Sequence, residues 1–202
     1  MGYDAATYGN HDFDNGIEGL IRQLPHANFP FINSNYELGG TALSESTLKN
    51  EVFDFNGMKI GVFGLGIELE GLVNPKLYGD VRYNDPIKEA NNQGNYLKNE
   101  IGCDFVICLS HLGFDYNSEK YNFDQQRICD KHVAKNSQNV DLFLGGHTHT
   151  FLDQPAYFAN SKNNTVMVCQ VGWAGIKLGR VDLYMDTITR IINGSYTAPK
   201  IS

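Results

Sequence analysis

The sequence predicts an α/β protein built around a mainly parallel sheet, with a run of antiparallel strands at its C-terminal end. Between residues 3 and 146, apolar runs typical of buried strands alternate with segments whose apolar residues recur at helical spacing. From residue 156 onward, short strand-like runs follow one another with turn signals and no helix between them, so an antiparallel meander is expected. Two mixed sheets packed face to face, with helices outside, accommodate both halves.

Local signals place the boundaries of these elements. Asp14 or Asn15 can cap the first helix, and Asp85-Pro86 provides a cap and a first-turn proline for a later one. Asn56-Gly57 is the strongest short turn signal and predicts a hairpin. The expected elements are strand 3–9, helix 17–24, strand 29–38, hairpin strands 51–55 and 58–66, loop 71–86, helix 86–101, strand 103–110, helix 122–136, and strands 140–146, 156–161, 164–172, 177–185 and 187–194.

Length, composition and charge limit the classes of function. The chain has 202 residues, and no linker or repeat divides it, so residues 1–202 are assigned to a single domain. A formal net charge of −7 argues against binding to long nucleic acid, although a small anion remains compatible with a locally cationic pocket. No apolar run approaches the roughly 20 residues of a membrane span, and no signal peptide is recognisable. The four cysteines lack CxxC spacing and are interpreted as small buried hydrophobes.

Three apolar runs end in polar turns that carry histidine. The run AATYGNHDFD surrounds His11, DFVICLSHLG leads to His111, and VDLFLGGHTHTF carries His147 and His149. Because ligands gather beyond the carboxyl ends of parallel strands, these side chains are expected to converge in one crevice. Neutral imidazole binds zinc, manganese, iron or nickel, so converging histidines with Asn10 and nearby aspartates predict a transition-metal site.

Each of these histidines has a simpler interpretation when it is taken alone. His11 could belong to ordinary turn chemistry, and His111 could be a core histidine with satisfied hydrogen bonds. His147 and His149 could line one face of a strand. Four separate coincidences at adjacent strand ends are less economical than one site, so the metal-site interpretation is preferred.

Two further features receive no functional assignment. His26 and His132 lie in helical contexts and are assigned to the surface. The segment GVFGLG, residues 61–66, is similar to a glycine-rich phosphate loop, but no helix is expected directly after it. A dinucleotide-binding role is therefore disfavoured.

The phrases GNHDFD, SHLG and GGHTH, in this order and each after an expected strand, resemble the motifs of the calcineurin-like metallophosphoesterases. GYDAATYGNHDFDNG, KIGVFGLG and FVICLSHLG look more closely like bacterial 5′-nucleotidases of that superfamily, and the resemblance extends from residue 1 to about residue 193. It implies a metallophosphoesterase-like sandwich of two mixed sheets flanked by helices. It also implies hydrolysis of a phosphate ester, in which two divalent ions clamp the phosphate and a metal-activated hydroxide attacks phosphorus.

The resemblance implies a set of metal ligands. Asn10, through its amide oxygen, together with His111 and His147, matches ligands of the second ion of that family. His149 matches a ligand of the first ion. Manganese, zinc, iron and cobalt all suit such a site, and availability decides among them.

His11 and Asp14 match a pair that binds phosphate in the resembled family. There the histidine faces the phosphate without binding metal, and the aspartate is its carboxylate partner. The pair makes independent physical sense, because a protonated imidazole can donate a hydrogen bond and a proton to oxygens that gain charge in the transition state. A carboxylate favours the protonated form and fixes its orientation. Asp12 stands where relatives often carry glutamate, and its role is left open.

Two motifs of the resembled family are missing from this sequence: an Asp-x-His strand end, and a Gly-Asp strand end whose aspartate bridges both ions. The domain is therefore expected to be N-terminally incomplete. Two ions held close without a bridging anion repel each other strongly. The chain alone is expected to bind one ion, through Asn10, His111 and His147, and to leave His149 underused. The C-terminal nucleotide-binding domain of 5′-nucleotidases is likewise expected to be absent, so substrate preference rests on analogy.

Three hypotheses of function follow. The first is a metal-dependent phosphoesterase of 5′-nucleotidase type that acts on nucleoside 5′-monophosphates in nucleotide catabolism, within a longer enzyme or with a complementary N-terminal chain. The second is a non-catalytic remnant that keeps the fold and one metal ion. The third, a nuclease of the same superfamily, is disfavoured by the acidic charge. The sequence leaves the location open, and a parent protein with a signal peptide would be periplasmic or at the cell surface.

Overall fold

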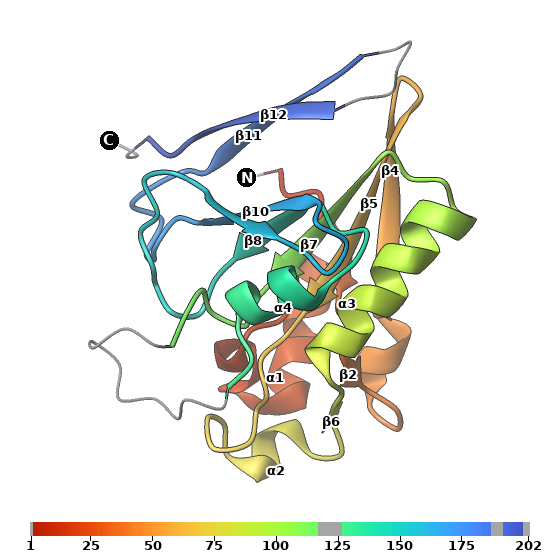
Figure 1. Ribbon diagram of the computed structural model, residues 1–202. Coiled ribbons are helices and arrows are strands. Elements are labelled where there is room, and N and C mark those ends of the chain that lie inside the picture. Colours follow the sequence, from red (N-terminus) through yellow and green to blue (C-terminus); the bar gives the residue numbers. More distant parts are fainter. Residues whose placement is uncertain (1, 117–126, 187–191, 200–202) are drawn as a thin grey trace.

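A computed structural model describes residues 2–116, 127–186 and 192–199 of the chain (Figure 1). Its helices are α1 (Gly16–Gln23), α2 (Pro75–Tyr78), α3 (Pro86–Asn95) and α4 (Asp130–Asn136), with 3-10 turns at Asn10–Phe13, Leu24–His26 and Ala42–Glu45 and a π-helical turn at Tyr96–Glu100. Its strands are β1 (Phe31–Ile32), β2 (Tyr36–Glu37), β3 (Thr47–Leu48), β4 (Asn50–Phe55), β5 (Met58–Leu65), β6 (Arg82–Tyr83), β7 (Phe105–Ser110), β8 (Leu142–Gly145), β9 (Ala156–Ala159), β10 (Thr165–Gln170), β11 (Arg180–Met185) and β12 (Ile192–Thr197).

Six strands form one mixed sheet, in the order β4-β5-β7-β8-β10-β9. The four inner strands are parallel to one another, while β4 and β9 pair antiparallel at the two edges. The other strands form the pairs β1-β3, β2-β6 and β11-β12. This arrangement confirms the predicted α/β class with a mainly parallel central sheet. The carboxyl ends of the inner strands lie at one edge, which is where parallel sheets place their functional groups.

The N-terminal segment differs from its expected form. Residues 3–9, all of which the structure describes, make no strand, and only Ala6 forms an isolated parallel bridge to β1. Residues 29–38 were expected as one strand but contain β1 and β2, which belong to different sheets. The chain turns between them because the Asn33 side chain accepts the amide N–H of Tyr36 at 2.8 Å.

The predicted hairpin and the cap of α3 are confirmed. Asn56 and Gly57 have φ values of 54° and 87°, as a type I′ turn requires, and they join β4 to β5. Asp85 accepts two amide N–H groups from the first turn of α3. The loop expected over residues 71–86 contains the short elements α2 and β6, so that expectation was only partly right.

Two helices begin differently from expectation. Asn15 occupies the N-cap position of α1, but its side chain makes no capping hydrogen bond. The helix expected over residues 122–136 starts at Asp130, after the non-helical residues 127–129. Residues 122–126 of that expected helix lie outside the described part of the chain.

The C-terminal strands form two separate hairpins and not one meander. β9 pairs antiparallel with β10, but β10 also lies parallel to β8 and so extends the central sheet. β11 and β12 pair with each other and lie above the sheet in Figure 1. Val168 and Cys169 of β10 point to opposite faces of the strand and are 0% and 2% exposed, which is the pattern of a strand covered on two faces. Of the strand expected over residues 187–194, residues 187–191 lie outside the described residues, and β12 begins at Ile192.

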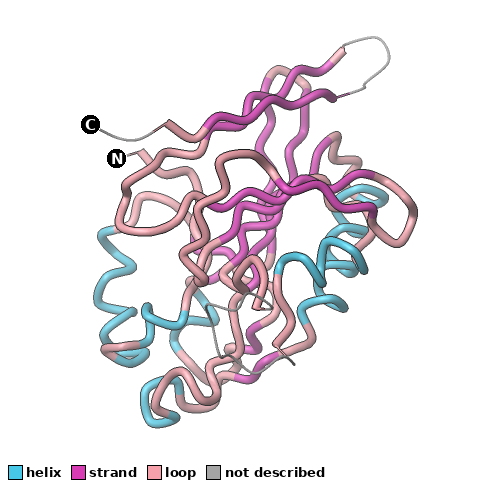
Figure 2. Tube along the Cα trace, turned by 60° about the vertical axis from the view of Figure 1, so that its left-hand side comes forward, coloured by secondary structure: helices cyan, strands magenta, loops and turns pink. Residues whose placement is uncertain are grey.

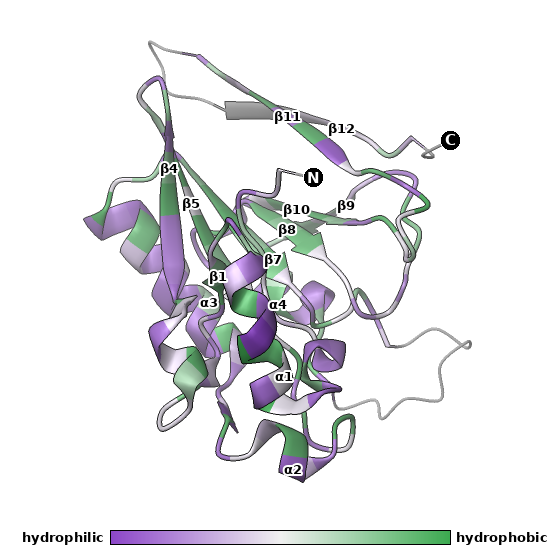
Figure 3. Cartoon of the chain, turned by 180° about the vertical axis from the view of Figure 1, so that it is seen from behind, coloured by the Kyte–Doolittle hydropathy of each residue, from purple (hydrophilic) through white to green (hydrophobic). Residues whose placement is uncertain are grey.

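The two faces of the central sheet are covered differently. α3 and α4 pack on one face, over a core that includes the fully buried Phe63, Val106 and Phe143. β1 and β11 contribute Ile32 and Leu183 to the cover of the other face. Figure 2 shows helices on two sides of the strands, and Figure 3 shows apolar residues concentrated in β5 and β8. A second core, which includes side chains of α1 and of the segment after β5, lies beyond the end of the sheet.

Side chains that were assigned no function behave mostly as expected. Cys103, Cys108, Cys129 and Cys169 are free and buried. His26 is exposed, whereas His132 is half-buried because its Nδ1 accepts the amide N–H of Cys129 in the first turn of α4. None of the described helices is long and apolar enough to cross a membrane.

Candidate metal centre

Two side chains from distant segments meet at the carboxyl ends of the parallel strands. Oδ1 of Asn10 lies 3.0 Å from Nδ1 of His147, although 137 positions separate them in the sequence. Asn10 opens the first 3-10 turn, and His147 follows the last residue of β8 by two positions. Atoms that coordinate one zinc ion each lie about 2.0–2.2 Å from it, which places neighbouring ligand atoms about 3 Å apart. The pair therefore fits two ligands of one ion.

His111 lies beside this pair, directly after the end of β7. Its ring centroid is 5.2 Å from that of His147. The close approach depends on glycine at position 9, because a β-carbon there would lie 2.6 Å from Nε2 of His111. This Nε2 is buried and has no hydrogen-bond partner among the described residues. A buried nitrogen without a partner is costly, and a bound ion would satisfy it.

Burial makes both imidazoles poor bases. Desolvation, with a smaller contribution from neighbouring cationic groups, lowers the pKa of His111 and that of His147 to about 4. Both rings are therefore neutral at neutral pH. Neutral imidazole is the form that binds divalent ions, so these two side chains need not release a proton first.

His11 and Asp14 form a pair at the surface next to this centre. Nδ1 of His11 lies 2.9 Å from Oδ2 of Asp14, and the two side chains are 79% and 59% exposed. The 3-10 turn brings them together, since residues three apart are eclipsed in such a turn. The side chain of Asp12 caps the same turn by accepting the amide N–H of Gly9 at 2.7 Å. The turn thus leaves His11 accessible to a ligand from solvent.

His149 has a different partner from the other three histidines. Its exposed ring stacks on Trp173, with 5.7 Å between the centroids and 16° between the planes. His147 and His149 have φ values of 75° and 52°, in the left-handed region. A strand has negative φ throughout, so the alternative in which both histidines line one face of a strand is wrong.

The donor set at this centre consists of one amide oxygen and two imidazoles. Across residues 2–116, 127–186 and 192–199, no three histidine, cysteine, aspartate or glutamate side chains are grouped closely enough to hold a metal ion. Asn10, His111 and His147 nevertheless fit one divalent transition metal, because imidazole and amide groups suit manganese, zinc, iron or cobalt.

A buried polar layer beneath the histidine loops was not predicted. It consists of Ser110, Asp130, Thr148 and Gln170, each at most 5% exposed. The Ser110 hydroxyl donates to Oδ1 of Asp130, and the Thr148 hydroxyl donates to Oε1 of Gln170. The sequence carried a signal for Gln170, which ends the apolar run TVMVCQ at the same edge of the sheet as the histidines.

Asp130 of this layer makes stability depend on pH. Burial raises the pKa of its carboxyl from 3.8 to about 7, although the hydrogen bond from Ser110 acts in the opposite direction. Between about pH 4 and 7, the folded chain keeps a proton that the unfolded chain releases, so stability falls as pH rises and then levels off. Asparagine cannot ionise, so this fall should be missing in Asp130→Asn. We therefore expect the unfolding free energy of Asp130→Asn, relative to that of wild type, to rise by about 2–3 kcal/mol from pH 5 to pH 8. Urea unfolding at both pH values measures this gain.

The control for this measurement is Asp4→Asn, which removes an exposed carboxylate. Its unfolding free energy should follow that of wild type at both pH values. If the Asp130→Asn and wild-type curves also run parallel, Asp130 does not hold a proton in the folded chain.

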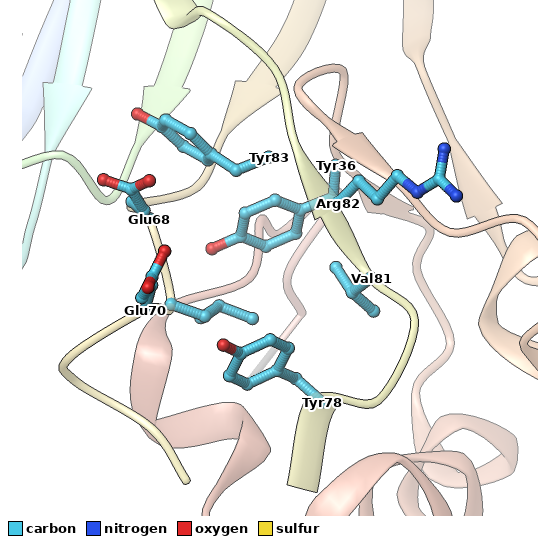
Figure 4. A pocket seen from close by; sticks show the side chains of 8 residues that line it. Tyr36, Glu68, Glu70, Tyr78, Val81, Arg82 and Tyr83 are labelled. Carbon is cyan, nitrogen blue, oxygen red and sulfur yellow. The ribbon is translucent and has the colours of Figure 1, made fainter. Parts of the chain in front are cut away.

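A separate pocket follows the end of β5 (Figure 4). Its volume is about 280 Å³, and it is lined by Tyr36, Glu68, Leu69, Glu70, Tyr78, Val81, Arg82 and Tyr83. Figure 4 shows the carboxylates of Glu68 and Glu70 on the same side as the tyrosine hydroxyl groups. Two carboxylates against one guanidinium disfavour an anion. A phosphate group therefore suits this pocket less well than the histidine loops.

Known proteins match most of this chain in sequence. Residues 3–151 match the calcineurin-like phosphoesterase family. The chain is 30% identical over 213 residues to a snake venom 5′-nucleotidase of Gloydius brevicauda, covering 96% of this chain and 34% of that protein. It is 33% identical over 152 residues to a 5′-nucleotidase of Vibrio cholerae, covering 73% of this chain and 27% of that protein. The chain thus matches between about a quarter and a third of the length of these relatives.

A solved structure agrees in fold. The 5′-nucleotidase precursor of Thermus thermophilus superposes with a TM-score of 0.83 at 24% identity, covering 98% of this chain and 39% of that one. The family match includes all three histidine-bearing turns, and the structure places each of them at the end of a strand or beside β1. Sequence match, fold and the order of the motifs agree, and the chain therefore belongs to the calcineurin-like phosphoesterase family.

Proposed function

We propose that this chain hydrolyses phosphate monoesters and that its substrates are nucleoside 5′-monophosphates. The observation that carries the proposal is the meeting of Asn10 and His147 beside His111, with both imidazoles neutral. The exposed pair of His11 and Asp14 on the same 3-10 turn as Asn10 supports it. The relatives from Gloydius brevicauda and Vibrio cholerae are named 5′-nucleotidases, which supports a nucleotide as the substrate.

In this proposal, Asn10, His111 and His147 hold a divalent ion. Such an ion, when bound, polarises the phosphoryl oxygens and offsets the charge that they gain in the transition state. His11 contacts the phosphate and donates a hydrogen bond, and a proton, toward the leaving oxygen. Asp14 accepts from Nδ1 of His11, which orients the ring toward the phosphate.

We further propose that this chain alone binds one ion. The described residues offer two imidazoles and an amide at the centre but no grouped carboxylates. A second ion close to the first needs a bridging anion to offset the repulsion between two dications. By analogy with the family, His149 would serve this additional ion, which corresponds to the first ion of the family, once carboxylates from a complementary N-terminal chain or segment are present.

The test is release of inorganic phosphate from AMP by the purified chain, with added manganese and after removal of metal with a chelator. Metal-dependent release from AMP that exceeds hydrolysis of single-stranded DNA supports the proposal. Faster cleavage of the DNA favours the nuclease alternative. Bound manganese without phosphate release, from AMP or from p-nitrophenyl phosphate, favours the non-catalytic remnant.

For a parent protein that carries a signal peptide, we propose a periplasmic or cell-surface location. The name of the Gloydius brevicauda relative, a venom enzyme, supports export within the family. Cell fractionation with an antibody against this chain would place it, and a cytosolic pool alone would contradict the proposal.

A further inference from the structure

Gln170 makes three hydrogen bonds to the loop Gly146–Thr150, which carries both histidines of the GGHTH motif. It is the last residue of β10 and is 1% exposed. Its Nε2 donates to the carbonyl oxygen of Gly146 at 2.8 Å. Its Oε1 accepts from the amide N–H of Thr150 and, at 3.1 Å, from the hydroxyl of Thr148. One side chain thus bonds the loop before, between and after the two histidines.

The loop needs such support because its backbone is strained. His147 and His149 have φ values of 75° and 52°. For residues with a β-carbon, this region is sterically unfavourable. Strained backbone persists only where the surroundings fix it from several directions. A relaxed loop would have to give up the bonds to Gln170, so the side chain and the strained conformation are coupled.

The same contacts reach the loop that carries His111. The Thr148 hydroxyl oxygen accepts the amide N–H of Phe114 at 2.9 Å, three residues after His111. The amide N–H of Asp130 donates to the carbonyl oxygen of Gly113 at 2.8 Å in the same turn. The two loops that carry His111 and His147 are therefore joined by hydrogen bonds to the backbone and not by packing alone.

We propose that Gln170 is a positioning residue, which sets the place of His147 relative to Asn10 and His111 so that the chain binds a divalent ion without rearranging the loop. This inference rests on the proposed function, because it takes His147 as a metal ligand. Gln170 itself is no ligand, since its oxygen already accepts two bonds from the loop. Partners that orient metal ligands typically contribute 10–100-fold to metal affinity.

The experiment is calorimetric titration of the full chain and its variants with manganese alone. Gln170→Leu removes all three bonds at similar volume, and we expect its Kd to rise about 10–100-fold. Thr148→Val removes a single hydroxyl at nearly constant volume, whereas Thr148→Ser keeps it. We expect the valine variant to bind more weakly and the serine variant to retain the wild-type Kd. If Gln170→Leu does not fold, the comparison of Thr148→Val with Thr148→Ser still tests whether the bond to Gln170 affects metal affinity.

Asn160→Ala is the matched control. Asn160 is a buried amide, 5% exposed, that also accepts backbone N–H groups, but in the turn between β9 and β10. The Asn160→Ala variant should have a lower melting temperature than wild type and an unchanged Kd for manganese. If Gln170→Leu and Thr148→Val also keep the wild-type Kd, Gln170 is a structural residue only and the inference is overturned. If the wild-type chain binds no manganese, the proposed function fails, and the inference fails with it.

Discussion

His11→Ala is expected to lower the turnover number for AMP hydrolysis by about 10²–10⁴-fold, the range of a positioned acid or base, and to leave the Kd for manganese unchanged. The two effects separate because the side chain of His11 and that of the proposed ligand Asn10 lie on different sides of the same turn. The His11 side chain is 79% exposed and pairs with Asp14, whereas Asn10 is buried against His147. Steady-state kinetics and manganese titration of the same preparation measure both quantities.

Asp14→Asn provides an isosteric companion to this variant. It keeps the size of the side chain that lies 2.9 Å from Nδ1 of His11 but removes its charge, so a smaller loss of turnover is expected. His26→Ala, at an exposed histidine of another 3-10 turn, is the control and should change neither quantity. If His11→Ala turns over AMP like wild type, His11 has no role in catalysis. If it loses manganese binding as well, His11 is a ligand.

The sequence could predict the places of His111 and His147, because the position of a polar residue after a buried strand depends on a local pattern. The apolar runs of β7 and β8 mark buried strands, and the polar residues directly after such runs lie at one edge of a parallel sheet. The hairpin at Asn56-Gly57 was predictable for a similar reason, since the left-handed backbone of a type I′ turn selects those two residues. In both cases a few consecutive residues contain all the information that is needed.

The rest depends on partners that no local pattern names. β10 carries an ordinary strand pattern, and only its position between β8 and β9 turns the expected meander into an extension of the central sheet. Gln170 could be recognised as a polar strand end, but its three bonds reach 20 to 24 residues away. Asp130 resembles any surface residue at a helix start, but in the structure it is fully buried and Ser110 of β7 donates a hydrogen bond to it.

Replacement of His147 is expected to abolish manganese binding. His147→Ala removes one of three donor groups, so the loss of affinity should exceed the 10–100-fold typical of residues that only orient a ligand. The wild-type titration should show one tight site per chain, and His26→Ala should reproduce it. Two tight wild-type sites would contradict the one-ion proposal. A wild-type Kd in His147→Ala would remove this histidine from the set of ligands.

His147→Gly extends this test to the backbone. In helices and strands, glycine is less stable than alanine by about 0.5–1 kcal/mol. The φ of 75° at position 147 reverses the steric cost, since glycine adopts this region freely and alanine does not. We expect His147→Gly to unfold in urea with a free energy about 1 kcal/mol above that of His147→Ala, although neither binds manganese. That order would mean that strain is held at the ligand itself, so that the chain loses stability to keep the imidazole next to Asn10. The opposite order would mean that the loop relaxes once the imidazole is gone.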